Sequence, residues 1–303
     1  MGRMLLILLI GFAASFGILS NSKNRRLNES VDRVVEKYGN YSANDVSSSG
    51  AYMALHKLYK DQSWRTGYSN KFINGDTLNL EIEDNSVDPS LGPFKLRIRS
   101  TANNEDATDV TEVTLFNGSF ADFAVWAKDS VTNVSTKDSL GNLDPSLLME
   151  NAPFMPDIDN SSLESAAVSQ GQVQSGSPFT PADGYPNGSF YYSGNTPNVT
   201  HVQGDLQVNG GTTIYGIFII EGNAVLNGNS RVEGVLYLPN PSTTVIYGGG
   251  SPQESSVTGG ILTWGTVDGT GNHISVQHSP EYMNLFAGGY AAEDPPIRVL
   301  TWQ

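Results

Sequence analysis

The charged residues between positions 200 and 265 are the side chains best suited to acid–base chemistry. Enzymes that cleave polysaccharides use two carboxyl groups, one as a proton donor and the other as a base or nucleophile. The charged residues of this tract are few and far apart: Asp205, Glu221, Arg231, Glu233 and Glu254. Because this spacing nominates no catalytic pair, we predict that the protein is not an enzyme.

The residues that bind metals are equally scattered. The four histidines are His56, His201, His273 and His278. The last two are five residues apart in a predicted strand and turn, which is no standard ligand spacing. The acidic segment NGDTLNLEIEDN lacks the regularly spaced Asp, Asn and Gly of a calcium loop. The chain has no cysteine, so thiol catalysis and disulfides are excluded, and we expect no cofactor.

Aromatic residues crowd the second half of the chain and allow two interpretations. They are Tyr185, Phe190, Tyr191, Tyr192, Tyr215, Tyr237, Tyr247 and Trp264. Such residues fill a core or a subunit contact, or they form a surface that stacks on sugars or on a partner.

The charge is distributed unevenly along the 303 residues, whose net charge is −14. Residues 1–70 carry nine Lys or Arg and five Asp or Glu, whereas the rest of the chain carries eight and twenty-six. A strongly acidic body argues against nucleic acid as a partner, because binding to phosphates needs the opposite sign.

The elements that must position these side chains begin with residues 4–20, an uncharged and mostly apolar run. It can be a cleaved export signal, a membrane anchor or the core helix of a filament. It lacks the charged start and the small-residue cleavage site of a signal peptide, so we expect it to be retained. About seventeen residues is at the short end of what spans a bilayer.

Residues 21–60 continue this run with a helical spacing of apolar residues, which predicts one helix over residues 1–60. Gly39 and Gly50 are its expected weak points. An amphipathic helix packs its apolar side against a domain. The residues expected to pack against the head are Leu27, Val31, Val34, Tyr38, Tyr41, Met53 and Leu55.

Residues 61–135 change to an alternation of polar and apolar residues in NLEIE, FKLRIRS, TEVTLF and FADFAVWA. This alternation predicts three or four antiparallel strands that cover the second half of the helix. Residues 136–200 are rich in Ser, Pro, Gly and Asn and are expected to be irregular linkers and loops.

Residues 201–303 contain an internal repeat. GDLQVNG at 204–210 returns as GNAVLNG at 222–228, and IYGIFII at 214–220 returns as VEGVLYL at 232–238. A third copy, VTGGILTW, starts at residue 257. Units this short must stack to bury an apolar face, which predicts a β-solenoid that the final PPIRVLTWQ closes or caps. The expected fold class is therefore α+β: a long N-terminal helix, an antiparallel β-sheet and a short β-solenoid.

This order of segments resembles type IV pilins and, more narrowly, the large PilX-like minor pilins of bacteria. The resemblance rests on NRRLNESVDRVVEKYGNYSANDVSSSGAYMALHKL, on the repeat tract and on the final RVLTWQ. Pilins usually carry an acidic fifth residue, whereas Leu5 stands here, or Ile7 if processing follows Gly2. Side-chain packing rather than a buried charge pair is then expected to set the register between subunits.

The resemblance implies a structural subunit of an extracellular cell-surface filament. Its partners would be other copies of itself in a helical homopolymer, the pilus assembly machinery and, before assembly, the inner membrane. The implied assembly residues are Met4, Leu5, Leu6, Ile7, Leu8, Leu9, Ile10, Phe12, Phe16, Ile18 and Leu19. One alternative is a low-copy tip adhesin whose β-coil domain binds a surface glycan or a cell target. Another is a membrane-anchored enzyme that acts on polysaccharide.

Overall fold

The computed structural model describes residues 2–104, 107–249, 253–292 and 297–303, with side chains from residue 7 onward. The chain divides into two compact units. The first unit is Met1–Asn117 with Pro296–Gln303, and the second is Gly118–Pro295. The second unit is therefore inserted into the sequence of the first.

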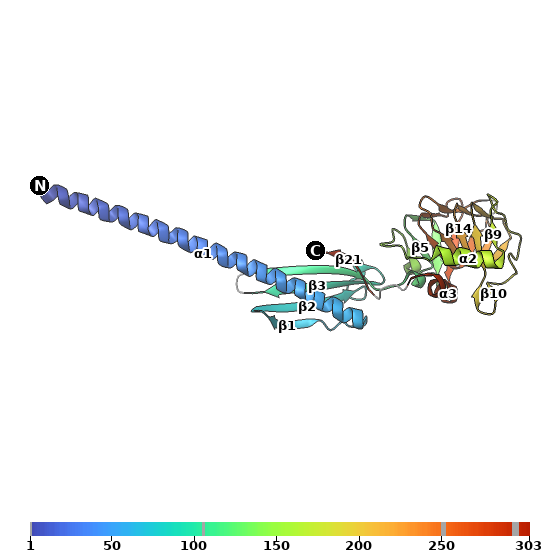
Figure 1. Ribbon diagram of the computed structural model, residues 1–303, viewed down its shortest axis with the longest axis horizontal. Coiled ribbons are helices and arrows are strands. Elements are labelled where there is room, and N and C mark those ends of the chain that lie inside the picture. Colours follow the sequence, from blue (N-terminus) through green and yellow to red (C-terminus); the bar gives the residue numbers. More distant parts are fainter. Residues whose placement is uncertain (1, 105–106, 250–252, 293–296) are drawn as a thin grey trace. The chain divides into compact units, whose positions relative to one another are not determined.

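The first unit begins with one continuous helix, α1 (Gly2–Lys60). At 1.5 Å per residue, its 59 residues extend for about 88 Å. Gly39 and Gly50 do not interrupt it, contrary to the expected weak points, and both glycines are buried. Figure 1 shows that the antiparallel sheet lies along the C-terminal part of α1.

The sheet of the first unit has five antiparallel strands in the order β1-β2-β3-β4-β21. Their bounds are β1 (Tyr68–Ile73), β2 (Asp76–Asp84), β3 (Lys95–Asn103), β4 (Thr108–Phe116) and β21 (Arg298–Trp302). Alternate residues of β2 and β3 are buried, as the period of two predicts. The buried set includes Leu80, Ile82, Leu96, Ile98, Val113 and Leu115, and Ala51, Ala54 and Leu58 of α1 complete this core.

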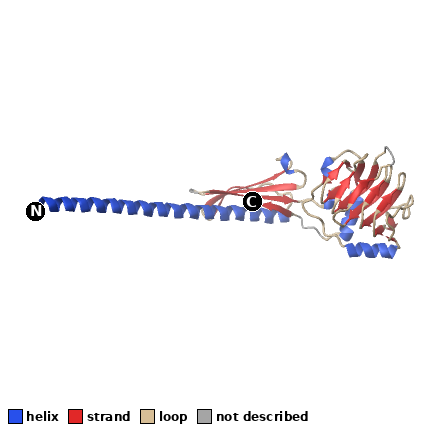
Figure 2. Ribbon diagram, turned by 90° about the horizontal axis from the view of Figure 1, so that it is seen from above, coloured by secondary structure: helices blue, strands red, loops and turns tan. Residues whose placement is uncertain are grey.

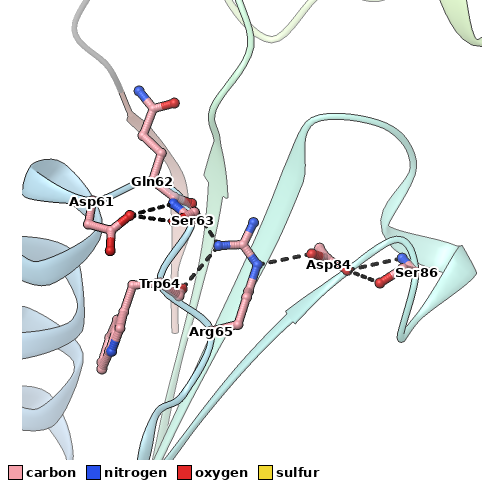
Figure 3. Close-up of polar contacts among 7 residues, drawn as sticks. All are labelled: Asp61, Gln62, Ser63, Trp64, Arg65, Asp84 and Ser86. Atoms are coloured by element: carbon pink, nitrogen blue, oxygen red, sulfur yellow. Dashed lines mark hydrogen bonds and ion pairs between the residues drawn. The ribbon is translucent and has the colours of Figure 1, made fainter.

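A polar link holds the segment that joins α1 to β1 (Figure 3). Arg65 donates from Nε to Oδ2 of Asp84 at 2.9 Å and from Nη1 to the carbonyl oxygens of Gln62 and Trp64. The hydroxyl of Ser86 donates to the other oxygen of Asp84. These hydrogen bonds fix the chain reversal at the end of the helix against the end of β2.

The second unit is a parallel β-solenoid. Its larger sheet has nine strands, seven of them in the order β7-β20-β18-β16-β14-β12-β9, and its smaller sheet has the order β13-β15-β17-β19-β6. Figure 2 shows these strands stacked side by side. The bounds in the larger sheet are β7 (Val134–Lys137), β9 (Val173–Gln174), β12 (Val199–Val202), β14 (Thr213–Ile220), β16 (Arg231–Leu238), β18 (Ser255–Thr263) and β20 (Ile274–His278). Those in the smaller sheet are β6 (Val131–Thr132), β13 (Leu206–Val208), β15 (Ala224–Leu226), β17 (Thr244–Tyr247) and β19 (Thr266–Asp268).

The eighteen-residue repeat corresponds to successive turns of the solenoid. Gly216 of β14 pairs in register with Gly234 of β16, which pairs in turn with Gly259 of β18. Valine, leucine and isoleucine side chains from both sheets fill the interior. The α+β class, the antiparallel sheet and the β-solenoid are therefore confirmed.

Short elements complete both units. The helices are α2 (Asn160–Gln170) and α3 (Pro280–Tyr290), with 3-10 turns η1 (Pro89–Leu91), η2 (Phe120–Asp122) and η3 (Pro145–Leu147). The remaining strands are β5 (Val125–Ala127), β8 (Leu148–Met149), β10 (Tyr191–Ser193) and β11 (Thr196–Pro197). Met283 of α3 packs against Gly260 of β18, and Phe286 lies 5.7 Å from the ring of Tyr237 on β16. This packing explains why residues 234–238 are buried on both faces of the sheet.

The structure differs from the predicted boundaries in three places. FADFAVWA belongs to the solenoid, because β5 pairs in parallel with β18 rather than with the antiparallel sheet. Residues 136–200 contain α2 and several solenoid strands instead of irregular loops alone. The final strand β21 does not cap the solenoid but pairs with β4, and the Trp302 ring lies 4.7 Å from that of Tyr52 on α1.

Candidate functional site

The candidate site is the part of α1 that precedes the sheet. From Ile7 to Leu19 the large apolar side chains are 60–72% exposed on all sides of the helix: Ile7, Leu8, Leu9, Ile10, Phe12, Phe16, Ile18 and Leu19. The predicted residues Met4, Leu5 and Leu6 lie in the helix, but their side chains are outside the described residues. The sequence has no charged residue between Arg3 and Lys23. The described part of this helix thus presents an apolar surface that no other described residue covers.

One side of this apolar helix surface has a shallow depression. A shallow hollow of about 440 Å³ is lined by Leu8, Gly11, Phe12, Ser15, Phe16 and Leu19. Gly11, which has no side chain, and Ser15, which has a small one, are four residues apart and therefore lie one above the other on one face of the helix. Small residues at this spacing let another helix approach closely. The pattern Gly-x-x-x-Ser is a sequence signal for a helix contact that the hydrophobic pattern alone does not reveal.

The residues predicted to pack against the head divide into two groups. Leu27, Val31, Val34, Tyr38 and Tyr41 are 59–75% exposed, so the described structure does not place them on the sheet. Met53 and Leu55 are half-buried, and Leu55 packs against the core of the first unit. The predicted packing of the first five residues is corrected, because buried contacts on this helix begin only at Gly39 and Ala43.

Small residues form the actual contact between α1 and the sheet. The buried side chains are those of Ala43, Val46, Ser47, Ala51, Ala54 and Leu58. Ser47 shares a 2.8 Å hydrogen bond with Thr111, and its hydroxyl also donates to Asp109. A side chain on Gly50 would have to displace Leu78, whose Cδ1 atom lies 2.7 Å from the Cβ position. The hydrophobic pattern did not reveal most of this face, because alanine, serine and glycine make up much of it beside Val46 and Leu58.

The histidines and carboxylates that the structure describes form no cluster able to hold a metal ion. Among the residues that the structure describes, no three His, Asp or Glu side chains converge on a point that could hold an ion. His201 lies 2.8 Å from Glu221, and His278 is buried with its Nε2 2.8 Å from the carbonyl oxygen of Ala121. Both rings therefore have hydrogen-bond partners within the fold.

The charged residues of the repeat tract are brought together only in part. Arg231, Glu233 and Glu254 line one polar hollow on the solenoid. Asp205 instead accepts a hydrogen bond from the backbone of Asn223, and Glu221 pairs with His201. The sequence did not predict this cluster, because extra residues between the second and third repeats separate Glu254 from Glu233 along the chain.

Comparisons with known proteins found no relative of this chain. No protein-family model, no curated protein and no solved structure matches the chain. Within the described part of the chain, no helix is both long enough and apolar enough to cross a membrane.

Proposed function

We propose that this protein is the structural subunit of an extracellular filament of the type IV pilus kind. The observation that carries the proposal is the exposed apolar surface of α1 between Ile7 and Leu19. Burying one large apolar side chain completely contributes about 1.5–3 kcal/mol, so the eight of this stretch represent at most about 12–24 kcal/mol. A surface of this size needs a cover, and the same helix on neighbouring subunits provides one.

The arrangement of the first unit supports this assignment. The last third of α1 is held by the sheet, while the preceding residues are free to enter a bundle of helices. The second exposed group, Leu27 to Tyr41, extends the available surface toward the head. Neighbouring subunits in a homopolymer would cover both groups.

The apolar run occupies two environments in turn during assembly. Before assembly the run resides in the inner membrane, and the assembly machinery moves it into the filament core. The exchange is inexpensive because one apolar environment replaces another. The acidic body of the subunit, exposed on the filament, keeps filaments soluble through mutual repulsion.

Electron microscopy of filaments sheared from cells that produce the protein together with its assembly machinery tests the proposal. We expect filaments with a core of helices formed by residues 4–41. Absence of the protein from every filament on these cells would refute it.

A low-copy tip subunit is the second candidate, which the polar hollow on the solenoid favours. The copy number per filament separates the two. A filament subunit makes up the length of the filament, whereas a tip subunit is present at a few copies and is labelled by antibody only at one end.

A further inference from the structure

The solenoid carries a polar hollow of about 530 Å³ on its larger sheet. Side chains from four consecutive strands, β16, β18, β20 and β7, line it. On β16, Val232 belongs to the core whereas Arg231 and Glu233 are at least partly exposed. Since side chains alternate along a strand, the polar lining residues of these strands lie on the outer face of the sheet, and Val257 of the lining belongs to the core.

The strand register arranges these side chains in rows. Glu233 pairs with Thr258, Thr258 with Gln277 and Gln277 with Lys137. Neighbouring strands are about 4.8 Å apart, so polar groups recur at this interval across the hollow. A second row, two residues earlier on each strand, begins with Arg231 and Ser256. Two parallel rows of evenly spaced donors and acceptors match a ligand with regularly repeated polar groups.

The residues that line the hollow carry equal numbers of positive and negative charges. Lys137 and Arg231 are matched by Glu233 and Glu254, and Nζ of Lys137 lies 3.7 Å from Oε1 of Glu254. The other polar side chains of the lining are carboxamides and hydroxyls. A balanced lining has no net attraction for an anion or a cation, and it offers both donors and acceptors to a neutral, hydroxyl-rich ligand.

Two further features of this surface favour the binding of a sugar. Glu233 is half-buried, and burial raises the pKa of its carboxyl group although Thr258 hydrogen-bonds to it. A partly desolvated carboxylate forms stronger hydrogen bonds than one in water. Tyr215 pairs in register with Glu233 and is half-buried, so it lies on the same face of the sheet, one strand beyond the residues that line the hollow. An aromatic ring beside hydrogen-bonding groups can pack against the apolar face of a sugar ring.

We propose that this hollow binds a neutral oligosaccharide, with successive sugar units laid across β16, β18 and β20. Glu233 and Gln277 hydrogen-bond the hydroxyl groups, and Tyr215 packs against one ring. This binding site is separate from the assembly surface of α1, so it does not depend on the proposed filament function.

The test is a binding screen of the full-length protein in detergent against neutral, uronic-acid, sialylated and sulfated oligosaccharides. We expect binding to at least one neutral oligosaccharide. The affinity for it should fall at least fivefold in Gln277→Ala and be abolished in Ser256→Tyr, which fills the hollow. The matched control is Gln207→Ala, because Gln207 lies on β13 of the smaller sheet and should leave binding unchanged.

Circular dichroism establishes that each variant is folded, and Glu233→Gln replaces Ser256→Tyr if the larger side chain unfolds the solenoid. Absence of binding to every neutral oligosaccharide would overturn the proposal. Binding that Gln277→Ala and Glu233→Gln leave unchanged, or binding restricted to the acidic oligosaccharides, would overturn it as well.

Discussion

Gly216 and Gly234 face each other in register on β14 and β16, and a Cβ atom on Gly234 would overlap the carbonyl oxygen of Gly216. Gly259 repeats the relationship with Gly234 on the next strand. All three have positive φ angles, between 116° and 154°. The glycine that marks each repeat in the sequence is therefore the residue that lets successive turns stack.

We predict that Gly234→Ala destabilises the solenoid by more than about 3 kcal/mol, because backbone strain and a steric overlap act together. Thermal unfolding followed by circular dichroism measures the effect. Gly171→Ala is the matched control, since Gly171 has a φ of 70° but open space at its Cβ position, and it should cost about 1 kcal/mol. Equal effects of the two substitutions would contradict the steric argument.

The corrected packing of α1 gives a second prediction. Leu58→Ala removes a fully buried side chain from the core of the first unit and should destabilise the isolated subunit by about 2–5 kcal/mol. Tyr38→Ala removes a ring that is 75% exposed and should change subunit stability by less than about 0.5 kcal/mol. Urea unfolding of the detergent-solubilised subunit distinguishes them. A large loss of stability in Tyr38→Ala would show that Tyr38 packs within its own subunit.

A charge in the apolar run should separate assembly from folding. Leu9 is 66% exposed and far from the sheet in the sequence, so Leu9→Asp should leave the circular dichroism and melting of the head unchanged. The carboxylate would have to be buried among neighbouring helices, at a cost of several kcal/mol, and filaments should not form. Leu9→Met is the matched control that keeps the apolar contact. Normal filaments of Leu9→Asp in electron micrographs would count against α1 as the assembly element.

Asp84 should make the first unit sensitive to acid. Hydrogen bonds from Ser86 and Arg65 lower its pKa to about 2 in the folded protein, from an ordinary value of 3.8. Stability from this group is therefore complete above about pH 4 and is lost as the pH falls toward 2. Asp84→Asn should cost about 1 kcal/mol at neutral pH, allowing for solvent screening, and almost nothing at pH 2.

Hydrogen exchange of peptides from residues 76–103, measured at both pH values, tests the effect of Asp84. Ser86→Ala should raise the pKa of Asp84 while leaving Arg65 in place. It should therefore destabilise the first unit less than Asp84→Asn does at neutral pH. An unchanged difference between Asp84→Asn and wild type from pH 7 to pH 2 would contradict the assignment.

The parts of the fold that could be predicted from the sequence are those that a local pattern of residues encodes. The alternation in β2 and β3 and the glycine spacing of β14 and β16 are patterns of this kind. Most of the face of α1 that packs on the sheet was not predicted, because alanine, serine and glycine make up much of it beside Val46 and Leu58. The partner of β21 also escaped, because its pairing with β4 joins segments separated by the whole solenoid, and no local pattern encodes such a contact. The polar hollow escaped for the same reason, since Glu233 and Lys137 come from distant turns.

The insertion of the solenoid into the first unit leads to the last prediction. Phe116, at the end of β4, is the cross-strand partner of Arg298, at the start of β21. Two antiparallel strands whose ends are paired can be joined by a two-residue turn such as Asn-Gly. Replacing residues 117–297 with Asn-Gly should therefore convert β4 and β21 into an ordinary hairpin and leave α1 and its sheet folded. The Trp302 ring lies tilted against that of Tyr52 and gives a local probe of this packing. For the comparison, Trp64 is replaced by Phe in both proteins, and Trp126 and Trp264 are replaced by Phe in the full chain. The Trp302 fluorescence of the two proteins should then match. If the shortened chain instead aggregates or shows no cooperative unfolding, the first unit depends on the solenoid for its stability, and the two cannot be regarded as independent folding units.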